Sequence, residues 1–306
     1  SPPWRLISRP SEMATFFLAE AGETPGCHPL TLTRSLGDFP LANIPLRRHQ
    51  AAALLALGLS EVSGADADLT VHASAWFSSA ELATFVADIS YGSMTTADGV
   101  VLVARKSGGR ELRASQSFAI NYAWDLLRAN VEAMTTRQAY AMESGAHASL
   151  YVDGRLQVGK GTKILPGVVI EGDVIIGDHC KVGPNCYIRG STSIGDKCHV
   201  GQAVEIKNSI LLPGTNVGHL SYLGDSILGE KVNFGAGTIT SNLRHDGGAH
   251  RSPVAGRMVD TGRRKLGAIV GDGVHTGIHT SLYPGRKLWP KTSTLPGAIV
   301  DKDILS

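Results

Sequence analysis

The sequence predicts an α/β domain over residues 1–150, followed by a left-handed parallel β-helix of hexapeptide repeats over residues 151–306. Aliphatic residues recur at every sixth position from residue 158, and segments typical of strands and helices alternate before residue 150. The 306 residues are 42% apolar and 18% charged, which is enough apolar material for two packed interiors.

The six-residue repeat is the strongest pattern in the chain. Nine consecutive positions spaced by six are β-branched aliphatic residues: Val158, Ile164, Ile170, Ile176, Val182, Ile188, Ile194, Val200 and Ile206. If about one residue in four is Val, Ile or Leu, such a run arises by chance only about a few times in a million. A period of six fits neither an α-helix nor a simple alternating strand.

A triangular solenoid fits this period, because each hexad supplies one short strand and one corner, and three hexads close a coil. The aliphatic residue is expected to point to the axis. Small residues four positions later, such as Thr162, Val168 and Val174, fill the tapered interior. Glycines directly after the aliphatic residue, such as Gly177 and Gly195, are expected to give the corners backbone freedom.

The four cysteines fit packing in reduced form. Cys27, Cys180, Cys186 and Cys198 form no CxxC pair, so neither a zinc site nor a disulfide framework is indicated. Cys180 and Cys198 are 18 residues apart, and we expect them to stack at one inward position of adjacent coils.

The repeat is interrupted in its second half. The step shortens to five residues at Leu211 and again at Leu228, and the pattern stops from Asn242 to Lys265 before it resumes at Val270. Breaks of this kind often carry function. We expect the long polar segment to reach a neighbouring subunit or to cover a cleft.

The first 150 residues alternate between the two kinds of element. Strands are expected over 13–22, 67–77 and 99–106, and helices over 45–62, 78–89, where Ser78 provides the cap, and 123–142. This order indicates an α/β layer domain.

Charge and hydropathy limit the partners. Lys and Arg exceed Asp and Glu by two, and no basic run is interleaved with aromatic residues, so neither nucleic acid nor a membrane surface is expected as a partner. No apolar run is long enough for a spanning helix and no secretory signal is evident. We therefore expect a cytoplasmic protein that binds small molecules and copies of itself.

Polar residues with catalytic chemistry lie around the register breaks. Transfer of an acyl group from a thioester to an amine needs a base, an oxyanion donor and a cation for an anionic substrate. His219 is a candidate base because histidine exchanges protons near neutral pH, and Arg189 and Lys207 are candidate phosphate ligands. A solvent-exposed histidine at a corner remains the alternative for His219.

The segment GHLSYLGDSILGEKVNFGAGTITSN resembles the acetyltransferase domain of bacterial N-acetylglucosamine-1-phosphate uridyltransferase/glucosamine-1-phosphate acetyltransferases, whose hallmark is GHLxYLGD…VNxGAGTITxN. The resemblance implies an enzyme that uses acetyl-CoA, with His219 as general base. It also implies that Arg189 and Lys207 bind the sugar phosphate. By the same resemblance, Tyr222, Asn233 and Asn242 contact the amino sugar, and Ala236 contacts the thioester through its backbone. We expect a homotrimer, because one solenoid face is too flat and apolar to remain in water and a cyclic trimer buries it.

The segment DTGRRKLGAIVGDGVHTGIHTSLYPG departs from the bacterial pattern and is closer to archaeal-type sugar-1-phosphate nucleotidylyltransferase/amino-sugar-1-phosphate acetyltransferases. By that resemblance Lys265, with Arg264, faces the active site. A solvated surface loop is the alternative.

The front half resembles the nucleotidyltransferase domain of that family in a reduced form. Its phosphate-binding turn has become AEAGETPGCHP, in which Pro25 lacks an amide donor and the usual arginine is missing. Glu20, Glu23 and Asp38 would repel a triphosphate. Nucleotidyl transfer is therefore expected to be lost, and Mg²⁺ is implied only if that activity is retained.

The main hypothesis is thus a CoA-dependent N-acetyltransferase for an amino-sugar phosphate such as glucosamine 1-phosphate. Two alternatives stay open. A catalytically retired scaffold predicts no affinity for CoA, and a divergent sugar-1-phosphate nucleotidyltransferase predicts pyrophosphate release.

Overall fold

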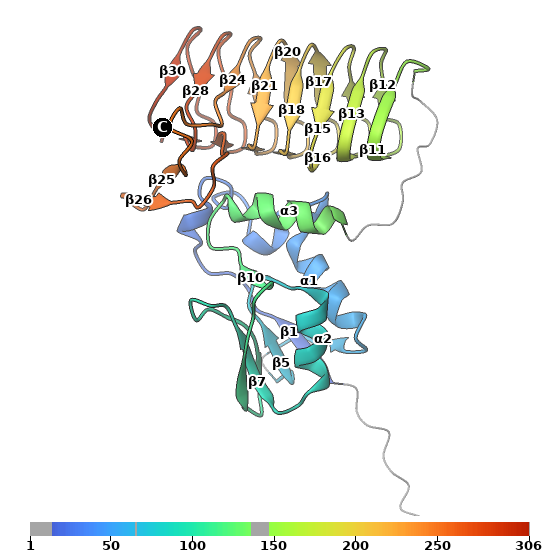
Figure 1. Cartoon of the computed structure of the whole chain (residues 1–306), viewed down its shortest axis with the longest axis vertical. Helices are drawn as coiled ribbons and strands as arrows, with labels where there is room; N and C mark the ends of the chain where they lie inside the picture. The colour runs from blue at the N-terminus through green and yellow to red at the C-terminus, as the bar shows by residue number, and fades with distance from the viewer. Residues whose placement is uncertain (1–13, 65, 136–146, 306) are drawn as a thin grey trace, which may run out of the picture. The chain divides into compact units, whose positions relative to one another are not determined.

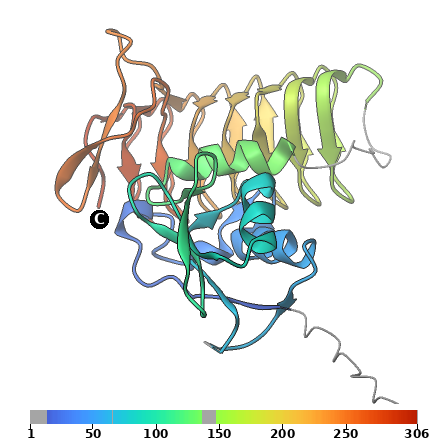
Figure 2. The same ribbon diagram turned by 60° about the horizontal axis from the view of Figure 1, so that its bottom comes forward.

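The computed structural model describes residues 14–64, 66–135 and 147–305. The chain forms two compact units, one built from residues up to Gly22 and Leu46–Ala119, the other from Glu23–Pro45 and the chain from Ile120 onward. Among the described residues, no helix has the length and apolar character needed to cross a membrane. Figures 1 and 2 show the elements of both units.

The first unit is an α/β layer, as predicted. A six-stranded mixed sheet has the order β4-β1-β5-β8-β7-β9, and β4, β1 and β5 run parallel. Its core packs Phe16, Leu69, Phe85 and Leu102. The elements of this unit are β1 (Thr15–Leu18), α1 (Leu46–Leu55), β4 (Ser60–Glu61), β5 (Leu69–Val71), β6 (Ala75–Trp76), α2 (Ser79–Ala87), β7 (Tyr91–Thr95), β8 (Val101–Arg105), β9 (Arg110–Arg113) and β10 (Phe118–Ala119).

Several expected boundaries in this unit were wrong. The helix expected over 45–62 is only α1, because Gly58 takes a φ of 81° and the chain then enters β4. The strand expected over 67–77 is split into β5 and β6. Ser78 does stand at the N-cap of α2, but its hydroxyl makes no cap hydrogen bond and donates to Gln116 instead.

The solenoid is built from two parallel sheets that share its coils (Figure 1). The five-stranded sheet contains β12 (Lys163–Ile164), β14 (Lys181–Val182), β17 (His199–Gln202), β20 (Asn216–His219) and β23 (Asn233–Phe234). The thirteen-stranded sheet contains β11 (Tyr151–Val158), β13 (Val169–Ile176), β15 (Tyr187–Arg189), β16 (Thr192–Ile194), β18 (Glu205–Lys207), β19 (Ile210–Leu211), β21 (Tyr222–Gly224), β22 (Ile227–Leu228), β24 (Ile239–Thr240), β27 (Ile269–Val270), β28 (Ser281–Leu282), β29 (Lys287–Leu288) and β30 (Ile299–Val300).

The larger sheet covers two sides of the solenoid, because β13 pairs with β15 through its first half and with β16 through its second. We call the stack β15, β18, β21, β24, β28 and β30 the first face. The stack β16, β19, β22, β27 and β29 is the second face, and the five-stranded sheet is the third face.

The predicted interior is confirmed. All nine residues of the repeat from Val158 to Ile206 are buried, and so are Leu211, Leu228 and Val270 beyond the register breaks. Lys181 pairs with His199, so Cys180 and Cys198 stack in adjacent coils, and all four cysteines are buried and free.

Backbone freedom explains only some of the repeat glycines, such as Gly183 with a φ of 103°. Gly177 and Gly195 do not adopt positive φ. They are needed for space, since a Cβ on Gly177 would lie 2.3 Å from Asp196 Oδ1 in the next coil. Several left-handed turn positions are filled by residues other than glycine, such as His179, Asn208 and Asp225.

The second face is covered from within its own unit. Its outward residues are all buried, namely Ile175, Ser193, Ile210, Ile227, Ile269 and Lys287. Helix α3 (Asp125–Thr135) reaches this face through Asn130, which accepts a hydrogen bond of 3.0 Å from Ser193 Oγ. The segment Glu23–Pro45 reaches it through Asn43, which donates to the Ile194 carbonyl, and through Arg34, which pairs with Asp272 at 2.7 Å.

The sequence predicts domains over 1–150 and 151–306, whereas the compact units divide the chain differently because Glu23–Pro45 and α3 pack with the solenoid. A functional boundary at residue 150 stays a prediction. Of the helix expected over 123–142, α3 confirms the part up to Thr135, and residues 136–142 lie outside the described residues.

Residues 242–265, here called the insertion, leave the solenoid as the repeat predicts. They contain an antiparallel hairpin of β25 (Arg251–Val254) and β26 (Arg257–Asp260). The two ends are fastened together, because the Leu266 amide donates to the Asn242 carbonyl at 3.0 Å and His250 Nε2 lies 3.0 Å from the same oxygen. These hydrogen bonds therefore hold the two ends of the insertion together beside Asn242.

Candidate functional site

The two predicted phosphate ligands lie in one row on the first face. In the strand register, Arg189 of β15 lies next to Lys207 of β18, and Lys207 lies next to Gly224 of β21. Adjacent coils are about 4.8 Å apart. The register thus brings both cations to one edge of the face, as the sequence predicts, and a glycine ends this row of long side chains.

Asp225 is the centre of the hydrogen-bond network at this edge. Its side chain is 4% exposed and accepts hydrogen bonds from Lys207 Nζ at 3.1 Å, Asn208 Nδ2 at 2.8 Å and Asn242 Nδ2 at 2.6 Å. The residue has a φ of 49°, a left-handed conformation that aspartate tolerates better than most residues. The carboxylate thereby fixes Lys207 and Asn242 relative to each other.

Gly224 leaves room for the two predicted sugar ligands. A Cβ at this position would lie 2.5 Å from the Tyr222 hydroxyl and 2.6 Å from Asn242 Nδ2. Asn242 donates to the Tyr222 hydroxyl at 3.1 Å. Burial, together with the neighbouring carboxylates of Glu205 and Asp225, raises the pKa of Tyr222, so its hydroxyl keeps its proton at neutral pH.

Arg189 is held by Glu205. Its Nε and Nη2 both donate to Glu205 Oε1, at 3.0 and 2.7 Å, and this pairing raises the pKa of the guanidinium. The guanidinium carbon also lies 5.3 Å from the centre of the Tyr187 ring. The side chain is about one-third exposed, so its remaining donors are accessible to an anion.

His219 stands at a different corner of the coil. It ends β20 on the third face, is exposed, and has the short corner at Leu220–Ser221 between it and Tyr222. Among the described residues, no hydrogen bond joins its side chain to Arg189 or Lys207. The expected convergence of all three in one cleft therefore stays a prediction.

Two other predicted residues lie in the coil after His219: Ala236 directly beside it, and Asn233 opposite Asn216, three residues before it. The Gly237 amide donates to the His219 carbonyl, and the β20–β23 register brings Ala236 next to His219. Asn233 starts β23 and is exposed. In the preceding coil Gln202 is aligned with His219 and His199 with Asn216. Burial, with the charges of Lys181 and His219, lowers the pKa of His199.

The insertion contributes a cation that sequence reasoning missed. Lys265 and Arg264 are exposed, whereas Arg263 is half-buried. Burial lowers the pKa of Arg263, and the carboxylates of Asp225 and Asp125 oppose this shift. Asp225 was missed too, although its place in YLGD directly after Gly224 was a usable signal.

No group of three or more His, Cys, Asp or Glu side chains suited to a metal ion occurs in the part of the chain that the structure describes. The site as it stands consists of paired cations, amide and hydroxyl groups, and a histidine at a neighbouring corner.

Residues 170–283 match the model of the GMPPB C-terminal domain family. A bifunctional sugar-1-phosphate nucleotidylyltransferase/acetyltransferase of Sulfurisphaera tokodaii is 45% identical over 102 residues, which is 33% of this chain and 25% of the relative. The bifunctional protein GlmU of Methanococcus aeolicus is 37% identical over 185 residues, 60% of this chain and 44% of the relative. The resemblance inferred from the sequence is confirmed. The chain is related, over part of its length, to these bifunctional proteins.

The chain spans at most 44% of these two relatives. Among solved structures, the H141A mutant of GDP-perosamine N-acetyl transferase from Caulobacter crescentus, in complex with CoA and GDP-perosamine, aligns over 94% of this chain and 92% of its own. Its sequence identity of 14% and TM-score of 0.22 are too low to support an argument from that likeness.

Proposed function

We propose that this protein is a CoA-dependent N-acetyltransferase that acts on an amino-sugar phosphate such as glucosamine 1-phosphate. The observation that carries the proposal is the Arg189–Lys207 row beside Tyr222, Asp225 and Asn242. It lies in a segment related to bifunctional sugar-1-phosphate nucleotidylyltransferase/acetyltransferases. Two cations next to neutral donors suit a phosphate attached to a hydroxyl-rich ring.

In the proposed reaction, the acceptor nitrogen attacks the thioester carbonyl of acetyl-CoA. His219 takes the proton that the amine loses. The tetrahedral intermediate collapses by breaking its carbon–sulfur bond, and the thiolate leaves and gains a proton to form CoA. Donors that stabilise the oxyanion are expected near the Ala236 backbone, and Asn233 is expected to contact the acceptor.

The separation of His219 from the cations favours a site completed by a second copy of the chain. The Lys207 row and His219 stand at opposite ends of β21, about 16 Å apart along the backbone. A cleft between adjacent solenoids would bring the two corners of neighbouring copies together. We propose a homotrimer, since cyclic assembly closes such heterologous contacts.

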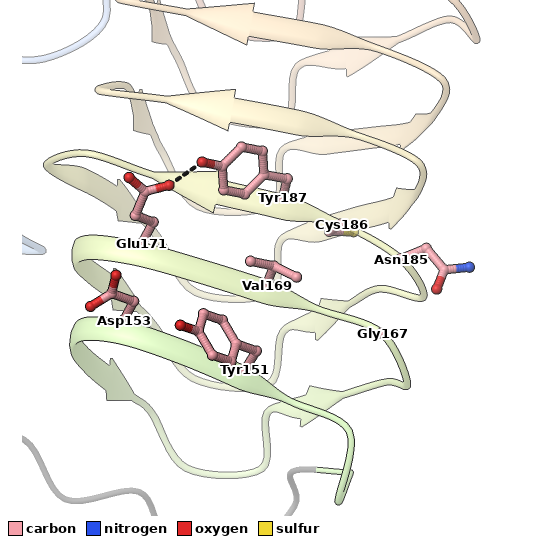
Figure 3. Close-up of a pocket in the computed structure, with 8 residues that line it drawn as sticks. All are labelled: Tyr151, Asp153, Gly167, Val169, Glu171, Asn185, Cys186 and Tyr187. Atoms are coloured by element: carbon pink, nitrogen blue, oxygen red, sulfur yellow. Dashed lines mark hydrogen bonds between the residues drawn. The ribbon is translucent and has the colours of Figure 1, made fainter.

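The first face suits this contact. Figure 3 shows Tyr151, Val169 and Tyr187 side by side on successive coils, around a cavity of about 350 Å³. Tyr151 is 60% exposed, and Ile239 and Ile299 on the same face are 42% and 68% exposed. By contrast, the second face is already buried and the third presents Lys163, Lys181 and His199.

A thiol-release assay with acetyl-CoA and a panel of amino-sugar phosphates tests the reaction. We expect release with wild-type protein and a loss of at least about 100-fold in His219→Ala. His72→Ala, at an exposed histidine of the first unit, is the matched control. Equal rates for wild type and His219→Ala would remove His219 from the mechanism, and absence of CoA binding in calorimetry would support a retired scaffold.

The trimer is tested separately by sedimentation, where the mass of a single chain would contradict it.

We further propose that nucleotidyl transfer is lost. Arg34, which follows the former phosphate-binding turn, is engaged with Asp272 and Glu230 at 2.7 and 3.1 Å. Pyrophosphate release from a nucleoside triphosphate, a sugar 1-phosphate and Mg²⁺ is the direct assay. A rate above the buffer blank would contradict this part of the proposal.

A further inference from the structure

A second cavity, of about 500 Å³, opens where the insertion leaves the solenoid. Part of its lining is apolar and consists of Leu243, Pro284 and Tyr283, whose side chain is half exposed. Ser241, Arg244, His245 and Asp246 provide polar groups. Apolar walls with a few polar groups are typical of small-molecule sites.

The cavity continues the row that holds the two cations. Tyr222 pairs with Ile239, and Ile239 with Ser281. Two residues farther along these strands, Ser241 therefore follows Gly224 in the row, and Tyr283 follows Ser241. Tyr283 lies three coils beyond Lys207, a distance of about 14 Å.

The arginine of the cavity lining is paired with a carboxylate of the same lining. Arg244 donates from Nε and Nη2 to the two carboxylate oxygens of Asp246, at 2.9 and 2.5 Å. This pairing and the Gly248 amide lower the pKa of Asp246 to about 2. The pair presents a flat, neutral edge with hydrogen-bond donors, which does not select phosphate.

We propose that this cavity binds a heterocyclic base that is linked to phosphate, with the base stacked on Tyr283. The inference rests on the proposed function, in which Arg189 and Lys207 hold the phosphate. A sugar ring bonded directly to the phosphate on Arg189 and Lys207 is too short to reach Tyr283, three coils away. The cavity therefore receives a second ring, the base. Aromatic side chains stack on any base, and arginine planes add to this.

Two substrates of the proposed reaction class carry such a base. One is CoA, through its adenine, and the other is an amino sugar linked to a nucleoside diphosphate. The experiment compares each with its base-free counterpart. The probes are CoA against pantetheine, and uridine diphosphate glucosamine against glucosamine 1-phosphate, by calorimetry on the full chain.

Tyr283→Ala is expected to weaken one base-bearing ligand by about 10-fold and to leave the affinities for pantetheine and glucosamine 1-phosphate unchanged. Tyr283→Phe retains the ring and is expected to stay within about twofold of wild type. Leu295→Ala is a matched exposed control outside the cavity, since Leu295 is 80% exposed. The identity of the weakened ligand assigns the base to CoA or to the acceptor.

Equal affinities of wild type and Tyr283→Ala for both base-bearing ligands would overturn the proposal, as would a wild-type protein that binds neither. A thermal melt of each variant shows that the fold is retained. Binding is measured without turnover. If Tyr283→Ala binds a base-bearing ligand more weakly than wild type does, but wild type releases no thiol, the proposed function is refuted and the base site is still supported.

Discussion

The carboxylate of Asp225 accepts a hydrogen bond from Asn242 across 2.6 Å, although the two residues stand on successive coils. The same carboxylate pairs with Lys207, so one buried anion holds two predicted substrate ligands. The insertion begins at Asn242, and just after it ends the Gly267 amide donates to the Asp225 carbonyl at 2.9 Å. Asp225 thus links the solenoid, the insertion and the candidate site.

Asp225→Ala is expected to lower the free energy of unfolding by about 2–4 kcal/mol, because it leaves the Lys207 ammonium and two amide donors without their shared acceptor. Asp225→Asn retains acceptor capacity and tolerates the left-handed backbone, so its loss should be about half as large. Urea denaturation monitored by circular dichroism measures both. An alanine variant as stable as the asparagine variant would show that the network contributes little.

Arg189→Gln and Lys207→Met are each expected to raise KM for a phosphorylated acceptor by about 10-fold or more, with a small change for the unphosphorylated amino sugar. The reason is that charge-assisted hydrogen bonds to phosphate are about twice as strong as neutral ones. Arg155→Gln removes another arginine paired with a carboxylate, Asp173, and serves as control. Equal increases in KM for both acceptors would argue against a phosphate contact.

His250 predicts a dependence of stability on pH. The side chain is 2% exposed, and burial lowers its pKa, with Arg244 and Arg286 acting in the same direction against hydrogen bonds to the Asn242 and Arg264 backbone. In the unfolded chain a histidine has a pKa of about 6.5. Below that pH His250 is protonated in the unfolded chain but stays neutral in the folded chain. Its contribution to the free energy of unfolding is therefore complete above about pH 6.5 and decreases as the pH falls.

His250→Gln should remove this component. The difference in Tm between wild type and variant is expected to shrink between pH 7.5 and pH 5. His28 and His199, whose pKa values are also lowered, are present in both proteins and cancel in the difference. A constant difference across this range would exclude His250 as the source.

Asn130→Ala tests how the second face is covered. The Asn130 side chain is buried and accepts hydrogen bonds from the Ala42 amide at 2.7 Å and from Ser193 Oγ at 3.0 Å. Its loss leaves two buried donors unpaired, and we expect a decrease of about 2–4 kcal/mol in unfolding free energy. Arg128→Ala, on the exposed side of α3, should cost less than about 0.5 kcal/mol. Similar values for the two variants would contradict this account.

The solenoid was predictable because its period reports backbone geometry directly. One inward residue per hexad, from Val158 to Ile206, suffices to define strands, corners and stacking. Arg189 and Lys207 were predicted to act together, and their pairing in register confirms that they are neighbours. Their joint role in substrate binding stays a prediction.

The details of the site and of the first unit depend on contacts between distant residues, which leave no periodic pattern in the sequence. Asp225 is recognisable as a hub only when Lys207 and Asn208 from the preceding coil and Asn242 from the following coil are seen around it. The burial of Arg263 depends on how the insertion returns to the solenoid. In the first unit, β7 and β9 were missed because their pairing, which includes a register shift after Tyr91, follows no local alternation.

The covering of the second face by Glu23–Pro45 bears on the order of synthesis. These residues leave the ribosome long before Ile210, Ile227 and Ile269, the coil residues whose outer surface is buried on that face. A fragment cut at residue 151 would therefore expose a row of aliphatic side chains to water and would tend to aggregate. The segment that covers these side chains is thus already synthesised when each of these coils is completed.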